Sequence, residues 1–589
     1  MHSSTLLAAA AVGASVAYAS CNGPFPMPLC KGVKIEDASI VELQQWLTEG
    51  QLTSQDLVEC YLARIEKTNE YLHSISEVNP DALDIAAQMD AERASGEIRG
   101  PLHGIPFLVK DNIYTDDKHN TSEGTLVLLG GKYSSEATIV TKLRAAGGVL
   151  LGHGTMSEAA DHRASSNYAS GYSSRTGQTR NPYNLTQSTA GSSSGPVVAV
   201  RSNQVAIAIG TETYGSLVHP AAQLGLYTIK STPGLMSRHG IVTGSYWHDT
   251  PGPLARSMKD VSIMLDIMVG IDRYDNLTAE AIGHEPPNGY AAEVVDKQAL
   301  RGMKLGLPWN PYWSTVAHIN SGDNRQEYEE MIQQLKDAGV EIYNITSNAA
   351  LSQIVSPYGQ GHPADIAPEH NHAIAFNTLL AVGYGEWLQN WTFPEDDERY
   401  GMSSLAEMAE WNDAHNETTG ALGNGTWWWD TKTGQSFYDA GVATNGTMGT
   451  AFWTAFGWGR FTARQAIDTL HRYVEEDGTV VELDGVVMPN GRDGNRGNAC
   501  APLPSYAGYP IAAVPTGADA YATPYGLCIY GKQYGEAKLV RVASAMEDLF
   551  QWNEHPKYFN YDTAQGPWQA SFPGYTCSES SLKSQHCAP

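Results

Sequence analysis

The chain has 589 residues, of which 42% are hydrophobic and 17% are charged, so it can build a large core and does not have the composition of a disordered protein. It carries 37 Lys and Arg against 64 Asp and Glu, a net charge of −27. Because a surface with this much negative charge repels phosphate backbones, we expect no nucleic-acid partner. No apolar run reaches the ~18 residues that a membrane-spanning helix needs.

The N-terminus predicts export. Residues 6–14 are apolar, and Ala17-Tyr18-Ala19 has the small-x-small form of a cleavage site, so we interpret 1–19 as a signal peptide and 20–37 as an N-terminal extension. Eight Asn-x-Ser/Thr sequons favour a glycosylating secretory pathway. They lie at Asn120, Asn184, Asn276, Asn344, Asn390, Asn416, Asn424 and Asn445. We therefore expect a secreted, extracellular glycoprotein.

The cysteines favour disulfides over zinc, because seven of them are scattered toward the termini without a CxxC pair. The odd number leaves one thiol unpaired within the chain, or one intermolecular bond. The sequence alone does not determine which cysteines pair in disulfides. The cysteines are Cys21, Cys30, Cys60, Cys500, Cys528, Cys577 and Cys587.

Helical and strand patterns alternate through the first half of the chain. Ser54 can cap a helix whose apolar residues recur at steps of three and four as far as Ile65. Short apolar runs bounded by Gly or polar residues predict buried strands. In chain order the pattern predicts helix 81–94, strand 105–109, helix 136–146, strand 148–152 and strand 205–209. Such alternation indicates an α/β fold with a mostly parallel or mixed sheet.

The composition changes at about 385–450, a stretch rich in Trp, Asn, Gly and Thr that carries four of the sequons. We interpret it as an insertion or subdomain. The alternation then resumes with a helix near 460–475, strands near Val486 and Ile511, and a helix at about 536–552. The main domain is expected over 38–552, with a C-terminal tail over 553–589.

Three separated segments could carry chemistry. The first ends an apolar run with Lys110, where a buried ammonium is costly unless it is neutral or paired. The second, 188–195, packs small hydroxyl residues between glycines around Ser192. The third, 210–220, follows the strand 205–209 and places Ser216 on a turn at a strand's carboxyl end, where α/β folds place their sites.

Taken together and in this order, the three segments resemble the amidase signature family of serine hydrolases. Lys110 lies 82 residues before Ser192, and Ser216 lies 24 residues after it. The resemblance extends over about 38–552, with 270–500 matched only loosely. It implies an amidase-signature fold, in which helices cover both faces of a large, twisted, mixed sheet.

The resemblance also implies a Ser-cisSer-Lys mechanism. Neutral Lys110 would accept a proton through Ser192, and the activated Ser216 hydroxyl would attack an amide carbonyl. The backbone N–H groups of Thr213, Tyr214, Gly215 and Ser216 match the family's oxyanion hole. The mechanism needs no cofactor and no metal. The expected reaction is hydrolysis of a small-molecule or peptide amide to a carboxylate and ammonia or an amine.

The motifs depart from the family pattern in places. Ala190 and Ser194 stand where Gly is frequent, and Glu212 and Tyr214 stand where many members have Asp and Gly. In this form the motifs are most similar to the peptide-amidase branch, which removes C-terminal amides from peptides. Tyr214, beside the nucleophile, could narrow the pocket or supply a hydroxyl.

Two alternatives come from other classes. Residues 191–195 fit GxSxG, the nucleophile elbow of α/β-hydrolase esterases, with Ser193 attacking. An elbow follows an apolar strand, however, and 184–190 are polar. The second alternative is a catalytically inactive binding protein of amidase descent, whose Trp-rich stretch binds carbohydrate. Loss of Lys110, Ser192 or Ser216 is expected in such a lineage, and all three are present.

Other polar residues are given structural roles. We expect Glu158 and Asp161 to be solvated or at a helix start, and Asp249 and Arg256 to pair near a turn. The histidines at 362, 370 and 372 are expected to lie in a solvated loop rather than to bind a metal.

Overall fold

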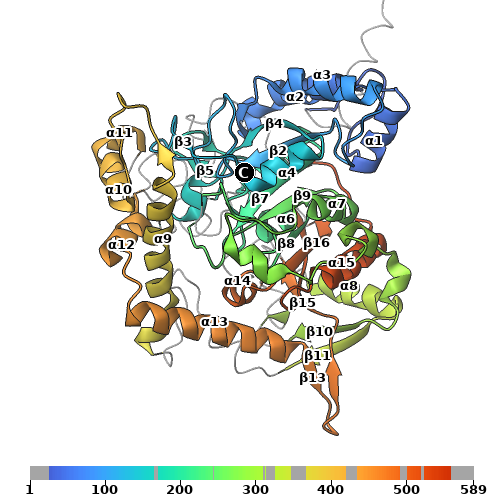
Figure 1. The fold of residues 1–589 in the computed structure, drawn as a ribbon. Coiled ribbons are helices and arrows are strands. Elements are labelled where there is room, and N and C mark those ends of the chain that lie inside the picture. Colours follow the sequence, from blue (N-terminus) through green and yellow to red (C-terminus); the bar gives the residue numbers. More distant parts are fainter. Residues whose placement is uncertain are drawn as a thin grey trace, which may run out of the picture.

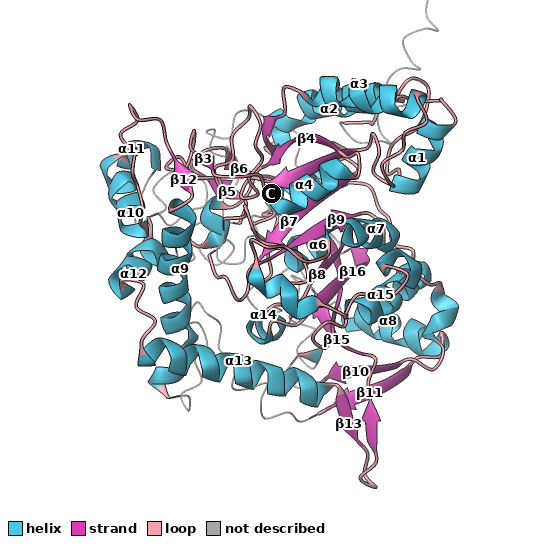
Figure 2. Cartoon of the chain, in the orientation of Figure 1, coloured by secondary structure: helices cyan, strands magenta, loops and turns pink. Residues whose placement is uncertain are grey.

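A mixed sheet of eleven strands forms the centre of the molecule (Figures 1 and 2). The computed structural model describes residues 25–164, 170–242, 244–309, 312–313, 325–346, 367–419, 434–490, 500–518 and 523–558. Across the sheet the strands follow the order β1 (Ile75–Val78), β4 (Val149–Gly154), β2 (Pro106–Lys110), β7 (Ile207–Glu212), β9 (Thr250–Ala255), β8 (Tyr227–Lys230), β16 (Ile511–Ala518), β17 (Pro524–Tyr530), β15 (Gly485–Asn490), β10 (Lys304–Pro308) and β11 (Glu341–Ile345).

The strand directions confirm the α/β class with a mixed sheet. Strand β2 runs parallel to β4 and β7, and β10 runs parallel to β11 and β15. The other neighbouring pairs are antiparallel. Every residue of β2, β7 and β9 is buried, and because successive side chains point to opposite faces, both faces of the sheet are covered.

Helices supply that cover. Helices α7 (Met258–Met268) and α15 (Glu536–Phe550) pack on each other and on strands of the sheet, and α5 (Ser194–Arg201) and α6 (Val218–Gln223) form a second contacting pair against β7 and β16. The helices of the first half are α1 (Ile40–Thr48), α2 (Ser54–Leu72), α3 (Ala82–Ala94) and α4 (Thr138–Ala145). Three further elements lie outside the eleven-stranded sheet: α8 (Arg325–Asp337), α14 (Pro502–Ala507) and the hairpin β5–β6 (Tyr172–Ser173, Gly177–Gln178).

Helix α2 begins where the sequence predicts, but its cap lies one residue earlier. Thr53 Oγ1 accepts from the Asp56 N–H (3.0 Å), and the Asp56 carboxylate accepts from the Thr53 N–H (2.9 Å). This capping box satisfies two N–H groups that the first turn leaves free. Ser54 is instead a buried helical residue.

A group of helices after residue 367 lies along one flank, at the left and lower edge of Figure 1. It holds α9 (His372–Leu388), α10 (Leu405–Ala414), α11 (Asn416–Thr419), α12 (Ser436–Thr444) and α13 (Thr450–Leu470). The helix predicted at 460–475 is wrong in its limits, because the apolar spacing already starts at Phe452 and residues 472–474 form β13 (Arg472–Val474), which pairs with β14 (Val480–Glu482).

Tryptophans of this flank fill its interior. Trp387 and Trp391 are buried, and the Trp387 ring stacks on Tyr133 at 4.1 Å. Tyr133 belongs to β3 (Lys132–Tyr133), which pairs with β12 (Trp391–Thr392) and so joins the flank to the first half of the chain. These contacts favour packing over a sugar-binding role for the two rings. Residues 427–429, the Trp triplet, lie outside the described residues.

Two disulfides are present among the described residues. Cys30 bonds to Cys60 and ties the N-terminal extension to α2, and Cys500 bonds to Cys528 of β17. The other three cysteines and the predicted signal peptide lie outside the described residues. Within the described ranges no helix is long and apolar enough to cross a membrane.

Candidate active site

Lys110 is the last residue of β2 and is fully buried between β4 and β7. Its Nζ lies 2.7 Å from Ser192 Oγ. The same nitrogen donates to Thr211 Oγ1 (2.9 Å) and lies 3.3 Å from the Thr211 carbonyl oxygen. A neutral amine has two N–H donors and one lone pair, so the two Thr211 oxygens can take both donors and leave the lone pair for the Ser192 hydroxyl.

The surroundings of Lys110 favour the neutral amine. Burial lowers its pKa from 10.5 to about 7, against the opposing attraction of the carboxylates of Asp161, Glu123, Asp249 and Glu212. A base with a pKa near 7 is in part unprotonated at neutral pH, and it holds a proton readily once it accepts one.

Ser192 is held on a tight loop that leads into α5. Ala190 has a left-handed backbone (φ 66°), and the following Gly191 closely approaches the neighbouring loop, since a Cβ there would lie 2.6 Å from Pro220 Cδ and 3.3 Å from Ser216 Cα. Glycine at 191 therefore lets the two serine loops meet. The Ser192 N–H donates to Ser216 Oγ (3.4 Å).

Ser216 follows the carboxyl end of β7, as the sequence predicts. Gly215 takes a left-handed conformation (φ 93°), in which a side chain would be strained. Glu212, the last residue of β7, accepts from the N–H groups of Leu217 (2.7 Å) and Val218 (3.0 Å) through Oε2. The carboxylate thus fixes the turn that carries Ser216, a role that the sequence pattern did not reveal.

Tyr214 is buried and faces helix α14, with its ring 5.8 Å from that of Tyr506. Gly215 also lies close to this segment, because a Cβ there would meet the Ala501 side chain at 3.2 Å. Ala501 adjoins the disulfide-bonded Cys500. One wall behind the nucleophile turn is therefore built from residues 500–507.

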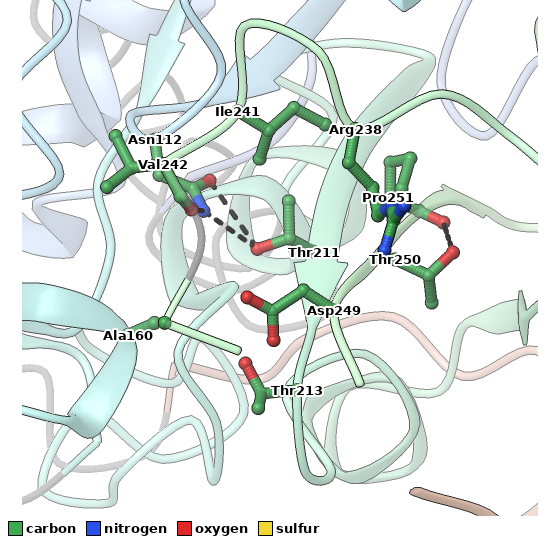
Figure 3. A pocket seen from close by; sticks show the side chains of 11 residues that line it. Asn112, Ala160, Thr211, Thr213, Arg238, Ile241, Val242, Asp249, Thr250 and Pro251 are labelled. Atoms are coloured by element: carbon green, nitrogen blue, oxygen red, sulfur yellow. Dashed lines mark hydrogen bonds between the residues drawn. The ribbon is translucent and has the colours of Figure 1, made fainter. Parts of the chain in front are cut away.

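A small cavity with both polar and apolar lining residues lies beside these loops (Figure 3). Thr211 connects it to the lysine, because Thr211 lines the cavity and also binds Lys110 Nζ. Its other lining residues are Asn112, Ala160, Thr213, Arg238, Ile241, Val242, Gly244, Asp249, Thr250 and Pro251.

Two predictions about neighbouring polar residues are wrong, and a third is confirmed in part. Asp249 and Arg256 do not pair, because they stand at opposite ends of β9; Arg256 instead donates to the Val200 carbonyl (2.6 Å). Glu158 does stand at a helix start, as the first residue of the 3₁₀ helix Glu158–Asp161, but it is buried and not solvated, in an ion pair with Arg163 (2.8 Å). His372 is buried within α9, where it contacts the Tyr506 ring, and residue 362 lies outside the described residues.

The described residues contain no group of three His, Cys, Asp or Glu side chains able to hold a metal ion. The esterase alternative finds no support in the structure. Ser193 Oγ is buried and donates to the Thr211 carbonyl (3.0 Å), and residues 184–190, all described, form no strand, with one bridge residue at 184 and a turn at 185–186. A nucleophile elbow needs a strand immediately before an exposed serine.

Comparisons with known proteins give the family of the chain. A family model described as Amidase matches residues 56–375. An amidase-named protein of Schizosaccharomyces pombe is 36% identical over 91% of this chain and 89% of its own length. An amidase-named protein of Arabidopsis thaliana is 32% identical over 89% of this chain and 92% of its own.

Solved structures give the same result. The native peptide amidase from Stenotrophomonas maltophilia superposes with a TM-score of 0.74 and 32% identity, covering 89% of this chain and 99% of that one. An amidase family protein from Bacillus anthracis gives a TM-score of 0.73 at 29% identity, over 89% of this chain and 93% of that one. The chain therefore belongs to the amidase signature family and is an amide-hydrolysing enzyme.

Proposed function

We propose that the enzyme cleaves the carbon–nitrogen bond of linear amides through an acyl-enzyme on Ser216. The observation that carries this proposal is the buried contact of Lys110 Nζ with Ser192 Oγ, with Ser192 itself bound to Ser216 Oγ through its N–H. A serine hydroxyl attacks only when a base takes its proton. Here the lysine is the base and Ser192 is the relay.

In the first half of the reaction Ser216 Oγ attacks the carbonyl carbon, while its proton passes to Ser192 and the Ser192 proton passes to Lys110. The carbonyl oxygen gains negative charge, and in this proposal the N–H groups of Thr213, Tyr214, Gly215 and Ser216 stabilise that charge. Such donors contribute about 2.7–4 kcal/mol each to transition-state binding in other hydrolases. The proton then returns through Ser192 to the leaving nitrogen, and ammonia or an amine departs.

In the second half a water molecule replaces the leaving group. The water oxygen attacks the acyl carbon. As it does so, the water gives a proton to Ser192, and Ser192 gives its own proton to Lys110. Ser216 Oγ leaves and recovers the proton by the same route. The products are a carboxylate and the free enzyme, so the lysine and both serines are unchanged over the cycle.

We propose the C-terminal amides of peptides as the substrate class. The support is the likeness to the S. maltophilia peptide amidase, which extends over nearly the whole of that chain, and the similar form of the motifs around Ser192 and Ser216.

We further propose that the enzyme is secreted. The predicted signal peptide and eight sequons support export, and the two disulfides are typical of an oxidising compartment.

The experiment is to incubate purified enzyme with an amidated peptide, an aryl amide and a fatty amide, and to measure ammonia or amine release with trapping of the acyl-enzyme by mass spectrometry. Ser216→Ala is expected to abolish both acylation and turnover. Ser193→Ala is the matched control and should still form the acyl-enzyme. Acylation of Ser216→Ala, or of Ser193 in the wild type, would contradict the assignment.

A further inference from the structure

Asp249 stands next to the nucleophile turn because of the register of two antiparallel strands. Glu212 at the end of β7 pairs with Thr250 at the start of β9. The residues beyond this pair, Thr213 and Asp249, therefore lie beside each other. Thr213 is the first residue of the turn that supplies the proposed oxyanion hole, and both residues line the cavity in Figure 3.

The Asp249 side chain is fixed in place. Its Oδ2 accepts from the Ser245 N–H (2.9 Å), and the Asp249 N–H donates to the Ser245 carbonyl (2.9 Å), which closes the turn between the two residues. The residue is only 6% exposed. Oδ1 makes no hydrogen bond that meets the usual distance and angle limits among the described residues, although the Thr213 hydroxyl lies close enough to lower the pKa of the carboxyl group; Figure 3 shows the carboxylate directed into the cavity.

A buried carboxylate oxygen without a partner is costly, so its retention needs a reason. Burial raises the pKa of Asp249 to about 6, while the Thr213 hydroxyl and the Ser245 N–H oppose that rise. The group is therefore largely ionised at neutral pH. Beside the Thr213 hydroxyl, Oδ1 can still accept from an N–H donor or pair with a cation.

The other charged and amide side chains of the cavity are already engaged. Arg238 donates through Nε to Asp275 Oδ2 (2.8 Å), so its charge is compensated. Asn112 Nδ2 contacts Thr211 Oγ1 (3.1 Å) and the Val242 carbonyl (3.3 Å). Asp249 Oδ1 is thus the acceptor that remains for a bound molecule.

The cavity measures about 10 Å³, which is room for one small polar group. It adjoins Thr213 on one side and, through Thr211, the lysine on the other. Thr213 lies three residues before Ser216. We therefore expect the part of a bound substrate nearest this cavity to be a group on the atom next to the reacting carbonyl.

We propose that Asp249 is a specificity-determining residue that accepts a hydrogen bond from an N–H donor on the carbon next to the reacting carboxamide. This inference rests on the proposed amide hydrolysis. Both an amino-acid amide, with an α-ammonium group, and a peptide amide, with an α peptide N–H, carry that donor. Simple alkyl and aryl amides do not, and they leave the buried carboxylate unpaired.

The test compares four amides that share one side chain: phenylalaninamide, N-acetylphenylalaninamide, N-acetyl-N-methylphenylalaninamide and 3-phenylpropanamide. We expect the wild-type kcat/KM for at least one of the first two to exceed those for the last two by about 100-fold or more, because a site built to bind a donor rejects analogues that lack it. The better of the first two identifies the source of the donor. Equal kcat/KM values across the four overturn the proposal without any variant.

Asp249→Asn gives the sharper readout. Because the oxygen that faces the Ser245 N–H must stay an acceptor, the new NH₂ group faces the cavity and replaces an acceptor with a donor. On the alkaline plateau of the pH profile Lys110 is neutral with or without the Asp249 charge. There we expect kcat/KM for the preferred donor-bearing amide to fall by about 100-fold and that for 3-phenylpropanamide to change by less than about threefold. Equal losses on all four amides would reduce Asp249 to a structural residue and overturn the proposal.

Asp260→Asn is the matched control. Asp260 is also a buried carboxylate that accepts from a backbone N–H (Ile40, 3.1 Å), but it lies in α7 and does not line the cavity. The Asp260→Asn variant should leave the ratios of kcat/KM among the four amides unchanged. If the wild type acylates Ser216 with 3-phenylpropanamide as readily as with the others, amide hydrolysis stands and only the role of Asp249 fails; if no amide reacts, the proposed function itself fails.

Discussion

Lys110 Nζ and Ser192 Oγ lie 2.7 Å apart in the interior, although 82 residues separate them in the chain. The contact exists because β2 and β7 are adjacent and parallel, so that the lysine at the end of one strand meets the loops that surround the end of the other. A buried lysine in contact with a hydroxyl can act as a base only while it is uncharged.

The pH dependence of turnover tests that state. Because burial lowers the pKa of Lys110 to about 7, the fraction of neutral amine rises as the pH rises through that value. We expect kcat/KM to increase with pH and to reach half its plateau near pH 7. Lys110→Ala should lower kcat by at least about 10³-fold at every pH, since general-base catalysis is lost. A variant that keeps most of its kcat would contradict the mechanism.

Lys110→Met tests the burial of the lysine amine through its effect on the free energy of unfolding. The pKa of the lysine is about 7 in the folded protein and 10.5 when exposed, so the unfolded chain binds more protons between these values. Below pH 7 the buried amine therefore lowers the free energy of unfolding of the wild type by its full amount. This loss shrinks as the pH rises and vanishes near pH 10.5. We expect Lys110→Met to be inactive but more stable near neutrality, by up to about 4 kcal/mol.

Denaturant unfolding at several pH values measures this difference. The gain in unfolding free energy should shrink steadily from pH 7 upward, which gives the experiment its internal control. A gain that does not depend on pH would assign the effect to packing of the methionine and not to the charge.

Thr211 offers a test of lysine orientation. Its Oγ1 accepts from Lys110 Nζ and also from Asn112 Nδ2 (3.1 Å). Thr211→Val keeps the shape but removes the acceptor, so the amine is less well oriented and its charged form loses a partner. We expect kcat to fall about 10- to 100-fold and the acid limb of the pH profile to move below 7. Thr211→Ser retains the hydroxyl and should keep both close to the wild type.

The sequence predicts the three main residues of the proposed site because their segments, in order and spacing, resemble the family motifs: Lys110 ends an apolar strand, Ser192 lies between glycines, and Ser216 follows a strand. Thr211 gave no such signal, since a threonine inside a strand is ordinary. Its importance arises only from the adjacency of β2 and β7.

Asp249 was misassigned for a different reason. Its neighbour across the sheet is set by the pairing of β9 with β7, and β9 contains two prolines and a glycine, a pattern that argues against a central strand. Without that strand, Asp249 and Arg256 seemed to flank a turn. The strand holds them about 20 Å apart, at ~3.3 Å per residue.

The sequons divide by exposure if the enzyme is secreted as proposed. Asn184 is 4% exposed and its side chain accepts from the Thr186 N–H (3.1 Å), so a glycan there is incompatible with the fold. Asn276, Asn344, Asn390 and Asn445 are exposed. Glycopeptide mapping of protein secreted from a eukaryotic host should find glycans among these four and none at Asn184. A glycan on Asn184 in active enzyme would contradict the described burial.

The two disulfides should differ in their effect on catalysis while matching in their effect on stability. They close loops of nearly equal length, with sequence separations of 30 for Cys30–Cys60 and 28 for Cys500–Cys528. The loop-closure model therefore gives about 3–4 kcal/mol of unfolding free energy for either. Only the second adjoins the wall behind the nucleophile turn, where Ala501 approaches Gly215.

We expect the double Cys→Ala variant of either pair to lose a similar unfolding free energy in denaturant titrations. Loss of Cys500–Cys528 should in addition lower kcat about 10-fold or more, because the oxyanion donors of the turn need fixed positions. Loss of Cys30–Cys60 should leave kcat within about twofold at a temperature where the variant remains folded, since that bond ties the N-terminal extension to α2, remote from the serines in the chain. Equal kcat values for the two variants would show that residues 500–507 do not hold the turn in place.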